Sequence, residues 1–111
     1  MSNSTEADIA VKEKLEIKEP SQYNVVVHNN DFTSYDEVIL VLSQAFKITH
    51  QEALDIAKKV DSDGKSICGT YSKEIADMKI LIVNMIKSSL IKIFPGRQRE
   101  ITMLKFTVEK S

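Results

Sequence analysis

The chain has 111 residues, of which 42% are hydrophobic and 28% are charged, with a formal net charge of −1 at pH 7. This length fits one domain with a modest core, and the balanced charge gives no reason to expect nucleic acid or a membrane as a partner. The apolar runs fall well short of the roughly 18–20 residues that a membrane span needs. The first residues do not resemble a secretory signal, and the single cysteine, Cys68, cannot form an internal disulfide, so we expect a reducing, cytoplasmic setting.

The first predicted element follows a polar segment. Residues 1–20 carry no aromatic residue and end at Pro20, a composition typical of a flexible tail, which leaves residues 21–111 for the domain. Residues 23–27 (YNVVV) predict a short strand because they are rich in β-branched side chains. Ser34 stands three residues before Glu37, a capping-box spacing that predicts the start of a helix. The apolar residues on one face of this helix are Val38, Val41, Leu42, Ala45 and Phe46.

A second helix and a second strand are expected next. Thr49 and Glu52 repeat the capping-box spacing, and Gly64 marks a turn or cap at the other end of this helix. Residues 65–72 (KSICGTYS) predict a strand, in which Gly69 indicates a weak point or a close backbone approach. The apolar stripe of the second helix is Ala53, Ile56, Ala57 and Val60.

The last elements complete an α+β pattern. Ser72 can cap a third helix, residues 92–100 (KIFPGRQRE) predict a linker, and residues 101–110 predict a final strand. The order β-α-α-β-α-β therefore indicates a single α+β domain, with a three-stranded sheet and helices packed on one face. The predicted apolar stripe of the third helix is Ile75, Met78, Ile82, Met85 and Ile86, and the predicted inner face of the last strand is Leu104, Phe106 and Val108.

Two ligand-binding motifs can be tested at residues 61–66 (DSDGKS). A phosphate-binding P-loop would need glycine where Lys59 stands, and an EF-hand calcium loop would need glutamate where Thr70 stands. A polar turn at the end of a helix is the better interpretation. A cysteine or zinc enzyme would need Cys68 to meet His28 or His50, and these three side chains are few for a zinc site. We expect no enzyme, metal or cofactor, and keep this alternative open.

The loop at residues 28–34 (HNNDFTS) is dense in hydrogen-bonding side chains. Asn, Asp, Thr and Ser favour turns because their side chains bond the nearby backbone. The same acceptors would also suit a cation or an amine at the mouth of a cleft. Composition alone favours the turn and does not exclude the site.

Four blocks of sequence carry a resemblance to a known family. They are Val27–Thr33 (VHNNDFT), Val60–Tyr71 (VDSDGKSICGTY), Glu74–Asn84 (EIADMKILIVN) and TVEK near the end of the chain. Together they resemble the ClpS family, bacterial adaptors that bring N-degron substrates to the ClpA-type AAA+ unfoldase of the Clp protease. The resemblance implies a β-α-α-β-α-β domain after a disordered tail, and we expect it to be monomeric.

The resemblance also implies a function and a set of residues. ClpS adaptors hold the free α-amino group of a protein whose first residue is Leu, Phe, Tyr or Trp, and its side chain enters an apolar pocket. By this resemblance Glu74 and Lys79 touch the N-domain of the unfoldase. The amine-binding residues would be Asn29, Asn30, Asp31 and Asp61. The pocket-lining residues would be Thr33, Tyr35, Val38, Ala57, Val60 and Leu104.

Several residues depart from the family pattern. Asn30 stands where the family usually has aspartate, Asp61 where it has histidine, and Tyr35 and Ala57 where it has methionine. Residues 88–102 also form a longer segment than usual. These departures keep open a second hypothesis, in which the chain is a diverged relative that docks on the unfoldase without reading N-termini.

Overall fold

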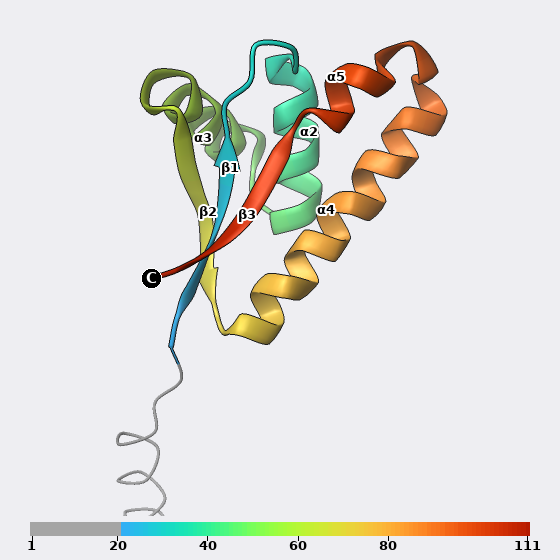
Figure 1. Ribbon diagram of the computed structural model, residues 1–111. Helices are drawn as coiled ribbons and strands as arrows, with labels where there is room; N and C mark the ends of the chain where they lie inside the picture. Colours follow the sequence, from blue (N-terminus) through green and yellow to red (C-terminus); the bar gives the residue numbers. More distant parts are fainter. Residues whose placement is uncertain (1–20) are drawn as a thin grey trace, which may run out of the picture.

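The structure, a computed structural model, describes residues 21–111, so the predicted tail at residues 1–20 lies outside the described residues. The described part forms three strands and four α-helices, which confirms the predicted α+β class (Figure 1). In chain order the elements are β1 (Tyr23–His28), α2 (Tyr35–Phe46), α3 (His50–Asp63), β2 (Lys65–Tyr71), α4 (Lys73–Ile93), the 3₁₀ helix η1 (Pro95–Arg97), α5 (Gln98–Thr102) and β3 (Lys105–Lys110).

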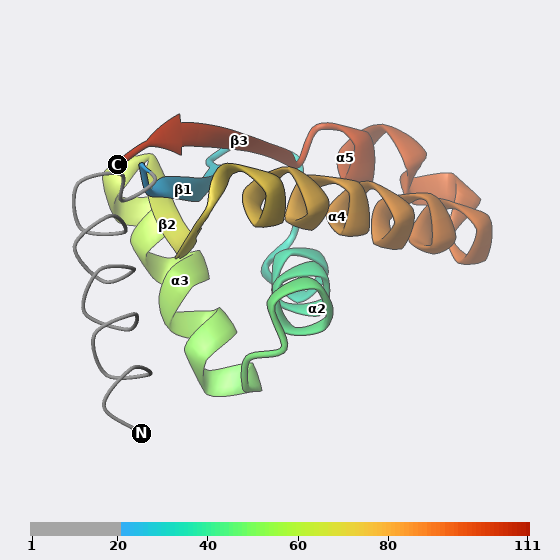
Figure 2. The ribbon, with the colours of Figure 1, turned by 90° about the horizontal axis from the view of Figure 1, so that it is seen from below.

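The three strands form one antiparallel sheet in the order β2-β1-β3. Figure 2 shows that α2, α3 and α4 all lie on the same side of this sheet. Val25 and Val27 of the central strand point to that side and are fully buried. The core therefore lies between the inner face of the sheet and the three helices, as the sequence pattern predicts.

A β-bulge interrupts the pairing of β1 with β2. Val25 pairs with Gly69 and Val26 pairs with Ile67, so Cys68 is the extra residue. A Cβ atom at Gly69 would clash with the ring of Tyr71. The space that Gly69 leaves open is therefore filled by a side chain, the ring of Tyr71.

Helices α2 and α3 begin at the two predicted capping boxes. Ser34 caps α2 and receives the N–H of Glu37 at 3.2 Å, while the Glu37 carboxylate accepts the N–H of Ser34 at 3.0 Å. Thr49 and Glu52 make the same reciprocal pair at the start of α3. Each box satisfies two backbone N–H groups that have no partner inside the helix. Both predicted helix starts are confirmed.

The predicted apolar stripe of α4 is wrong at three of its five positions. Ile75, Met78 and Met85 are exposed, whereas the buried residues are Ala76, Val83 and Leu90. Helix α4 is apolar around most of its circumference, so its pattern does not identify the side that faces the core. Helix α4 has 21 residues, and no helix within residues 21–111 combines the length and apolar character that a membrane span requires.

The predicted linker at residues 92–100 is also wrong, because this segment is mostly helical. Helix α4 continues to Ile93, Pro95 starts η1, and α5 follows directly. Proline suits the first turn of a helix, where its missing N–H costs nothing. Strand β3 starts at Lys105 and not at residue 101, since Ile101 belongs to α5 and is buried in the core.

Gly64 ends α3 and provides the first testable prediction. It has φ +88°, its N–H bonds Val60, and its carbonyl accepts the N–H of Asn29 at 2.8 Å. Left-handed backbone costs an L-residue about 1–2 kcal/mol, so Gly64→Ala should lower the free energy of unfolding by about that amount.

Gly96→Ala is the matched control for Gly64→Ala, because Gly96 has no positive φ and an added Cβ meets no atom within 4 Å. The control should leave stability unchanged or raise it slightly. Urea denaturation of both variants measures the difference. Equal effects at the two glycines would contradict the role assigned to Gly64.

Candidate functional site

A small cavity opens where the end of β1 meets α2 and α3. Its volume is about 30 Å³, which is enough to hold water. Residues from five parts of the chain meet there, because the αα-hairpin folds back onto the end of the central strand. The lining residues are Val27, His28, Asn29, Asn30, Thr33, Tyr35, Val38, Ala57, Val60 and Leu104.

The structure thus brings together all six residues expected to line a pocket and two of the four expected to bind an amine. The floor of the cavity is apolar. Val38, Ala57, Val60 and Leu104 are each less than 10% exposed. The polar side chains stand on the other side, on the loop after β1. Such a combination of an apolar floor with a few polar groups at the rim is typical of sites for small molecules and side chains.

A hydrogen bond joins α2 to α3 beside the cavity. The hydroxyl of Tyr35, the first residue of α2, donates to Oδ2 of Asp61 in the last turn of α3 at 3.0 Å. This bond raises the pKa of the Tyr35 phenol, because the carboxylate stabilises the neutral form that donates. Asp61 itself is exposed and lies outside the cavity lining. In this conformation the Tyr35–Asp61 pair links the two helices, and its carboxylate already holds a donor.

The side chain of Asn30 forms hydrogen bonds within its own loop. Its Oδ1 atom accepts the backbone N–H of Phe32 at 2.9 Å and that of Thr33 at 2.8 Å. This arrangement is the local turn that the residue composition favours. Both lone pairs of the Asn30 oxygen are therefore used within the loop in this structure. In this structure the Asn30 oxygen shapes the loop, and the expected contact between Asn30 and an amine stays a prediction.

The other two expected amine-binding residues remain on the surface. Asn29 is exposed and lines the cavity, and its backbone N–H is anchored on Gly64. Asp31 is exposed and is not among the lining residues. Both side chains are exposed on the loop beside the cavity and carry acceptor oxygens, and their contact with an amine stays a prediction.

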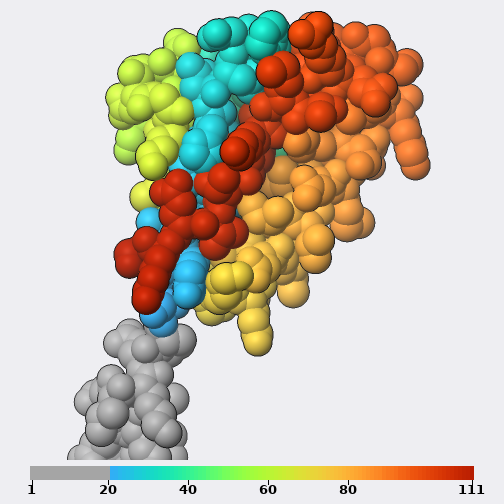
Figure 3. Space-filling view, in the orientation of Figure 1, coloured from blue at the N-terminus to red at the C-terminus, as the bar shows by residue number. Residues whose placement is uncertain are grey.

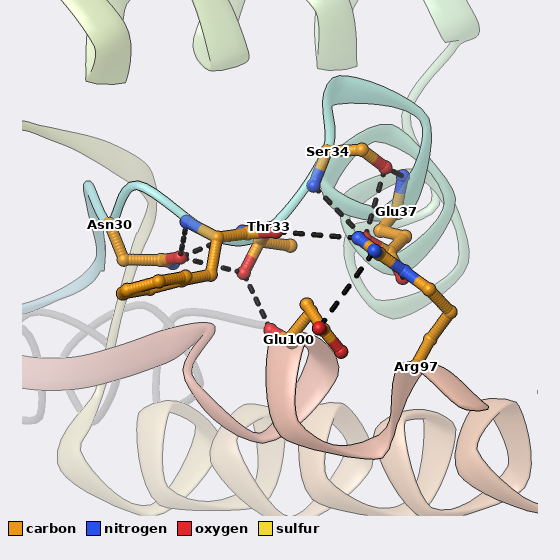
Figure 4. A network of polar contacts seen from close by, with 7 residues as sticks. Asn30, Thr33, Ser34, Glu37, Arg97 and Glu100 are labelled. Carbon is orange, nitrogen blue, oxygen red and sulfur yellow. Dashed lines mark hydrogen bonds and ion pairs between the residues drawn. The ribbon is translucent and has the colours of Figure 1, made fainter. Parts of the chain in front are cut away.

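A network of polar contacts behind the loop was not predicted from the sequence. It connects Thr33 and Glu37 to Arg97 and Glu100 of the segment after α4 (Figure 4). The partners are 60 or more residues apart in the chain. The sequence offered one sign of this network. The two arginines of the chain, Arg97 and Arg99, both lie in the longer segment at residues 88–102.

The two residues expected to dock the unfoldase differ in their surroundings. Glu74 is exposed in the first turn of α4. The Lys79 ammonium donates to the carbonyl of Ala45 at 3.3 Å and lies within 6 Å of the ring centres of Phe46 and Tyr71. Lys79 therefore ties α4 to the end of α2 in this conformation, whereas Glu74 is accessible.

The structure gives the enzyme alternative no support. Burial raises the pKa of the Cys68 thiol to about 12, which leaves almost no nucleophilic thiolate at neutral pH. His28 bonds the Thr107 hydroxyl at 2.7 Å, and His50 is exposed at the start of α3. Within residues 21–111, no three side chains of His, Cys, Asp or Glu lie close enough to hold a metal ion.

Comparison with known proteins decides the family. The family model described as "ATP-dependent Clp protease adaptor protein ClpS" matches residues 18–105. The chain belongs to the ClpS family. An ATP-dependent Clp protease adapter protein ClpS from Vibrio atlanticus (strain LGP32) is 44% identical over 79 residues, which cover 71% of this chain and 74% of that protein. One from Vibrio cholerae serotype O1 (strain ATCC 39541) is 40% identical over 82 residues, which cover 74% of this chain and 77% of that protein.

A solved ClpS structure shares the fold. Agrobacterium tumefaciens ClpS2 bound to L-phenylalaninamide superimposes with a TM-score of 0.67 at 21% identity, covering 83% of this chain and 99% of that one. The resemblance to the ClpS family and the α+β fold class are therefore both confirmed. Membership in this family makes the chain an adaptor of the Clp protease.

The Tyr35–Asp61 bond can be tested without any ligand. Asp61→Ala removes the acceptor that favours the neutral phenol, so the pKa of Tyr35 should fall toward its ordinary value of about 10. Titration of the tyrosine Cζ resonances by ¹³C NMR measures this change. Tyr71 is the internal control, because its pKa is raised chiefly by burial and should not move. An unchanged Tyr35 titration in Asp61→Ala would show that the two side chains do not meet in solution.

Proposed function

We propose that the chain binds proteins through a free N-terminal residue with a bulky hydrophobic side chain and delivers them to a ClpAP-type protease. Family membership makes it an adaptor of the Clp protease. The observation that carries the finer proposal is the cavity, whose apolar floor and polar loop lie together at the end of β1. The phenylalaninamide bound to the Agrobacterium relative is a free amine beside an aromatic side chain, which agrees with this proposal.

The chemistry of the site suits such a ligand. An α-ammonium has three N–H donors and no acceptor, so it needs acceptor oxygens around it. Asn29 and Asp31 provide these on the loop, and Asp61 provides a third from the end of α3. The side chain of the guest residue would then enter the apolar space between Val38 and Val60. Ala57 makes this space deeper than a methionine would, since its side chain is a single methyl group.

We propose that Tyr35 moves when the guest binds, because it lines the cavity and its hydroxyl is bonded to Asp61. In this proposal the hydrogen bond from Tyr35 to Asp61 breaks when the guest residue enters the cavity. The Asp61 carboxylate would then exchange a neutral phenol donor for the charged ammonium of the guest. Charge on both partners makes the second bond the stronger one. The ligand therefore replaces an internal hydrogen bond with a better one, and Tyr35 becomes free to pack on the guest.

To deliver its substrate, the chain would contact the unfoldase through residues of α4. Glu74 is exposed at its first turn and can reach a partner without rearrangement. Lys79 would contribute only by leaving the Ala45 carbonyl and the two aromatic rings beside it. We therefore propose Glu74 as the primary contact and Lys79 as a secondary one.

The Tyr35–Asp61 bond favours a second candidate function, a regulator that docks on the unfoldase without reading N-termini, because the bond engages a carboxylate expected to hold the amine. The two functions predict opposite results with short peptides. The regulator would bind none of them at the cavity, and the adaptor would bind those with a free bulky first residue.

A peptide panel decides between them. Fluorescence anisotropy with peptides that start with Phe, Leu, Trp, Arg or Ser should give tight binding for the bulky hydrophobic residues only. Acetylation of the Phe peptide should abolish binding, because it removes the charge and two of the three donors. Binding that survives acetylation, or no binding by any peptide, would refute the proposed reading of N-termini.

Asp31→Ala is the variant for the same assay, with Asp55→Ala as the matched control. Both remove one exposed carboxylate, and only Asp31 lies on the loop at the cavity. Hydrogen bonds to charged groups contribute about 1.5–3 kcal/mol, so Asp31→Ala should weaken binding by roughly tenfold or more. The control should change it by less than about twofold, the size of a screened surface charge effect.

A further inference from the structure

The segment after α4 packs against the loop that carries the acceptors. Figure 3 shows this segment, in red-orange, beside the cyan residues of the loop and the start of α2 at one end of the molecule. None of the residues expected to bind the amine or line the pocket lies in η1 or α5. We propose that η1 and α5 form a brace that holds the loop in its binding conformation, and that Arg97 is a positioning residue for N-terminal recognition. The effect on binding rests on the proposed function.

The first contact of the brace is made by Thr33. Its hydroxyl donates to the carbonyl of Glu100 in α5 at 2.7 Å, while Asn30 Oδ1 lies 3.0 Å from the same hydroxyl. One hydroxyl has one proton, and the shorter bond to Glu100 takes it. Asn30 is then held by the backbone N–H groups of Phe32 and Thr33. Thr33 therefore connects the turn of the loop to α5, with its backbone N–H in the turn and its hydroxyl on α5.

The second contact is the ion pair between Arg97 and Glu37. Nε of Arg97 donates to Oε2 of Glu37 at 3.1 Å, and Nη2 donates to Oε1 at 2.7 Å. These hydrogen bonds lower the pKa of Glu37, so its carboxylate is ionised at neutral pH. A bidentate pair of this kind fixes direction as well as distance. Glu37 also belongs to the capping box of α2 together with Ser34, so Arg97 holds the start of the helix that follows the loop.

The third contact reaches the loop backbone itself. Nη2 of Arg97 also donates to the carbonyl of Phe32 at 3.3 Å, and the Arg99 guanidinium lies 5.8 Å from the centre of the Phe32 ring. One guanidinium thus contacts the loop and the helix cap together, as Figure 4 shows from close by. Lysine cannot reproduce this, since its ammonium is a point charge without a planar fork.

Such a brace matters because the acceptors stand on a loop. Residues 29–34 separate β1 from α2 and form no regular structure of their own. Ordering a loop on binding costs conformational entropy that weakens affinity, and a loop ordered beforehand avoids this cost. The brace acts on Phe32 and Thr33, directly after Asp31, so it limits where the Asp31 and Asn29 oxygens can be.

The test compares Arg97→Ala and Arg97→Lys with Lys92→Ala, all in the full chain. Lys92 is an exposed cation near the end of α4 and serves as the charge-matched control. Two quantities are measured: the affinity for a Phe-starting peptide, and the NMR hydrogen-exchange rates of the Phe32 and Thr33 amides. Arg97→Ala should weaken binding by roughly 2- to 12-fold and speed exchange at both amides. Arg97→Lys should lie between Arg97→Ala and the original chain, and Lys92→Ala should match the original chain.

Each outcome of this comparison bears on the brace. If the original chain binds the peptide and Arg97→Ala changes neither affinity nor exchange, the brace is wrong and the proposed function stands. If the original chain does not bind, the proposed function fails, and loop exchange alone decides whether Arg97 orders the loop. If exchange in Arg97→Ala also rises at Ala57 in the core of α3, overall stability has been lost. The Arg97→Lys variant then tests the brace, through its affinity for the peptide and its exchange rates at the Phe32 and Thr33 amides.

Discussion

The turn built on the side-chain oxygen of Asn30 is the interaction on which the rest of the site depends. It accepts the N–H groups of Phe32 and Thr33 and so directs the chain from the end of β1 into α2 within residues 29–34. Asn29 and Asp31 flank this turn, and their positions follow from it. An acceptor oxygen at residue 30 is needed for the turn, and either aspartate or asparagine provides one. Asparagine therefore keeps the shape of the loop and removes one negative charge from it.

Two of the residues expected to depart from the ClpS pattern meet beside the cavity. They are the carboxylate of Asp61 and the phenol of Tyr35. Together they form a hydrogen bond between α2 and α3. The two side chains are thus physically coupled, because the tyrosine supplies the donor that satisfies the carboxylate in this conformation. In the proposed function this hydrogen bond breaks when a charged amine arrives.

The sequence predicted local features well. Capping boxes at Ser34 and Thr49 depend on residues three apart, and the strands depend on short β-branched runs, so both can be identified without knowing the fold. The buried side of α4 was missed because residues such as Met78 and Val83 are equally apolar and only the packing distinguishes them. Helix α5 was missed because Pro95 and Gly96 are typical of a turn.

The family resemblance predicted the cavity residues that the structure brings together, but not the contacts of Asn30 and Arg97. Both contacts depend on which oxygen faces which donor, in one case across 60 residues of chain. The central claim is that this loop stays fixed while the Tyr35–Asp61 pair opens to admit a free N-terminal residue. A crystal structure of the chain with a short Phe-starting peptide tests it most directly. We predict that Asn30 Oδ1 keeps its bonds to Phe32 and Thr33, while Tyr35 leaves Asp61 and the ammonium contacts Asn29, Asp31 and Asp61. A peptide bound elsewhere, or an Asn30 oxygen turned toward the amine with the Tyr35–Asp61 bond intact, would contradict the account.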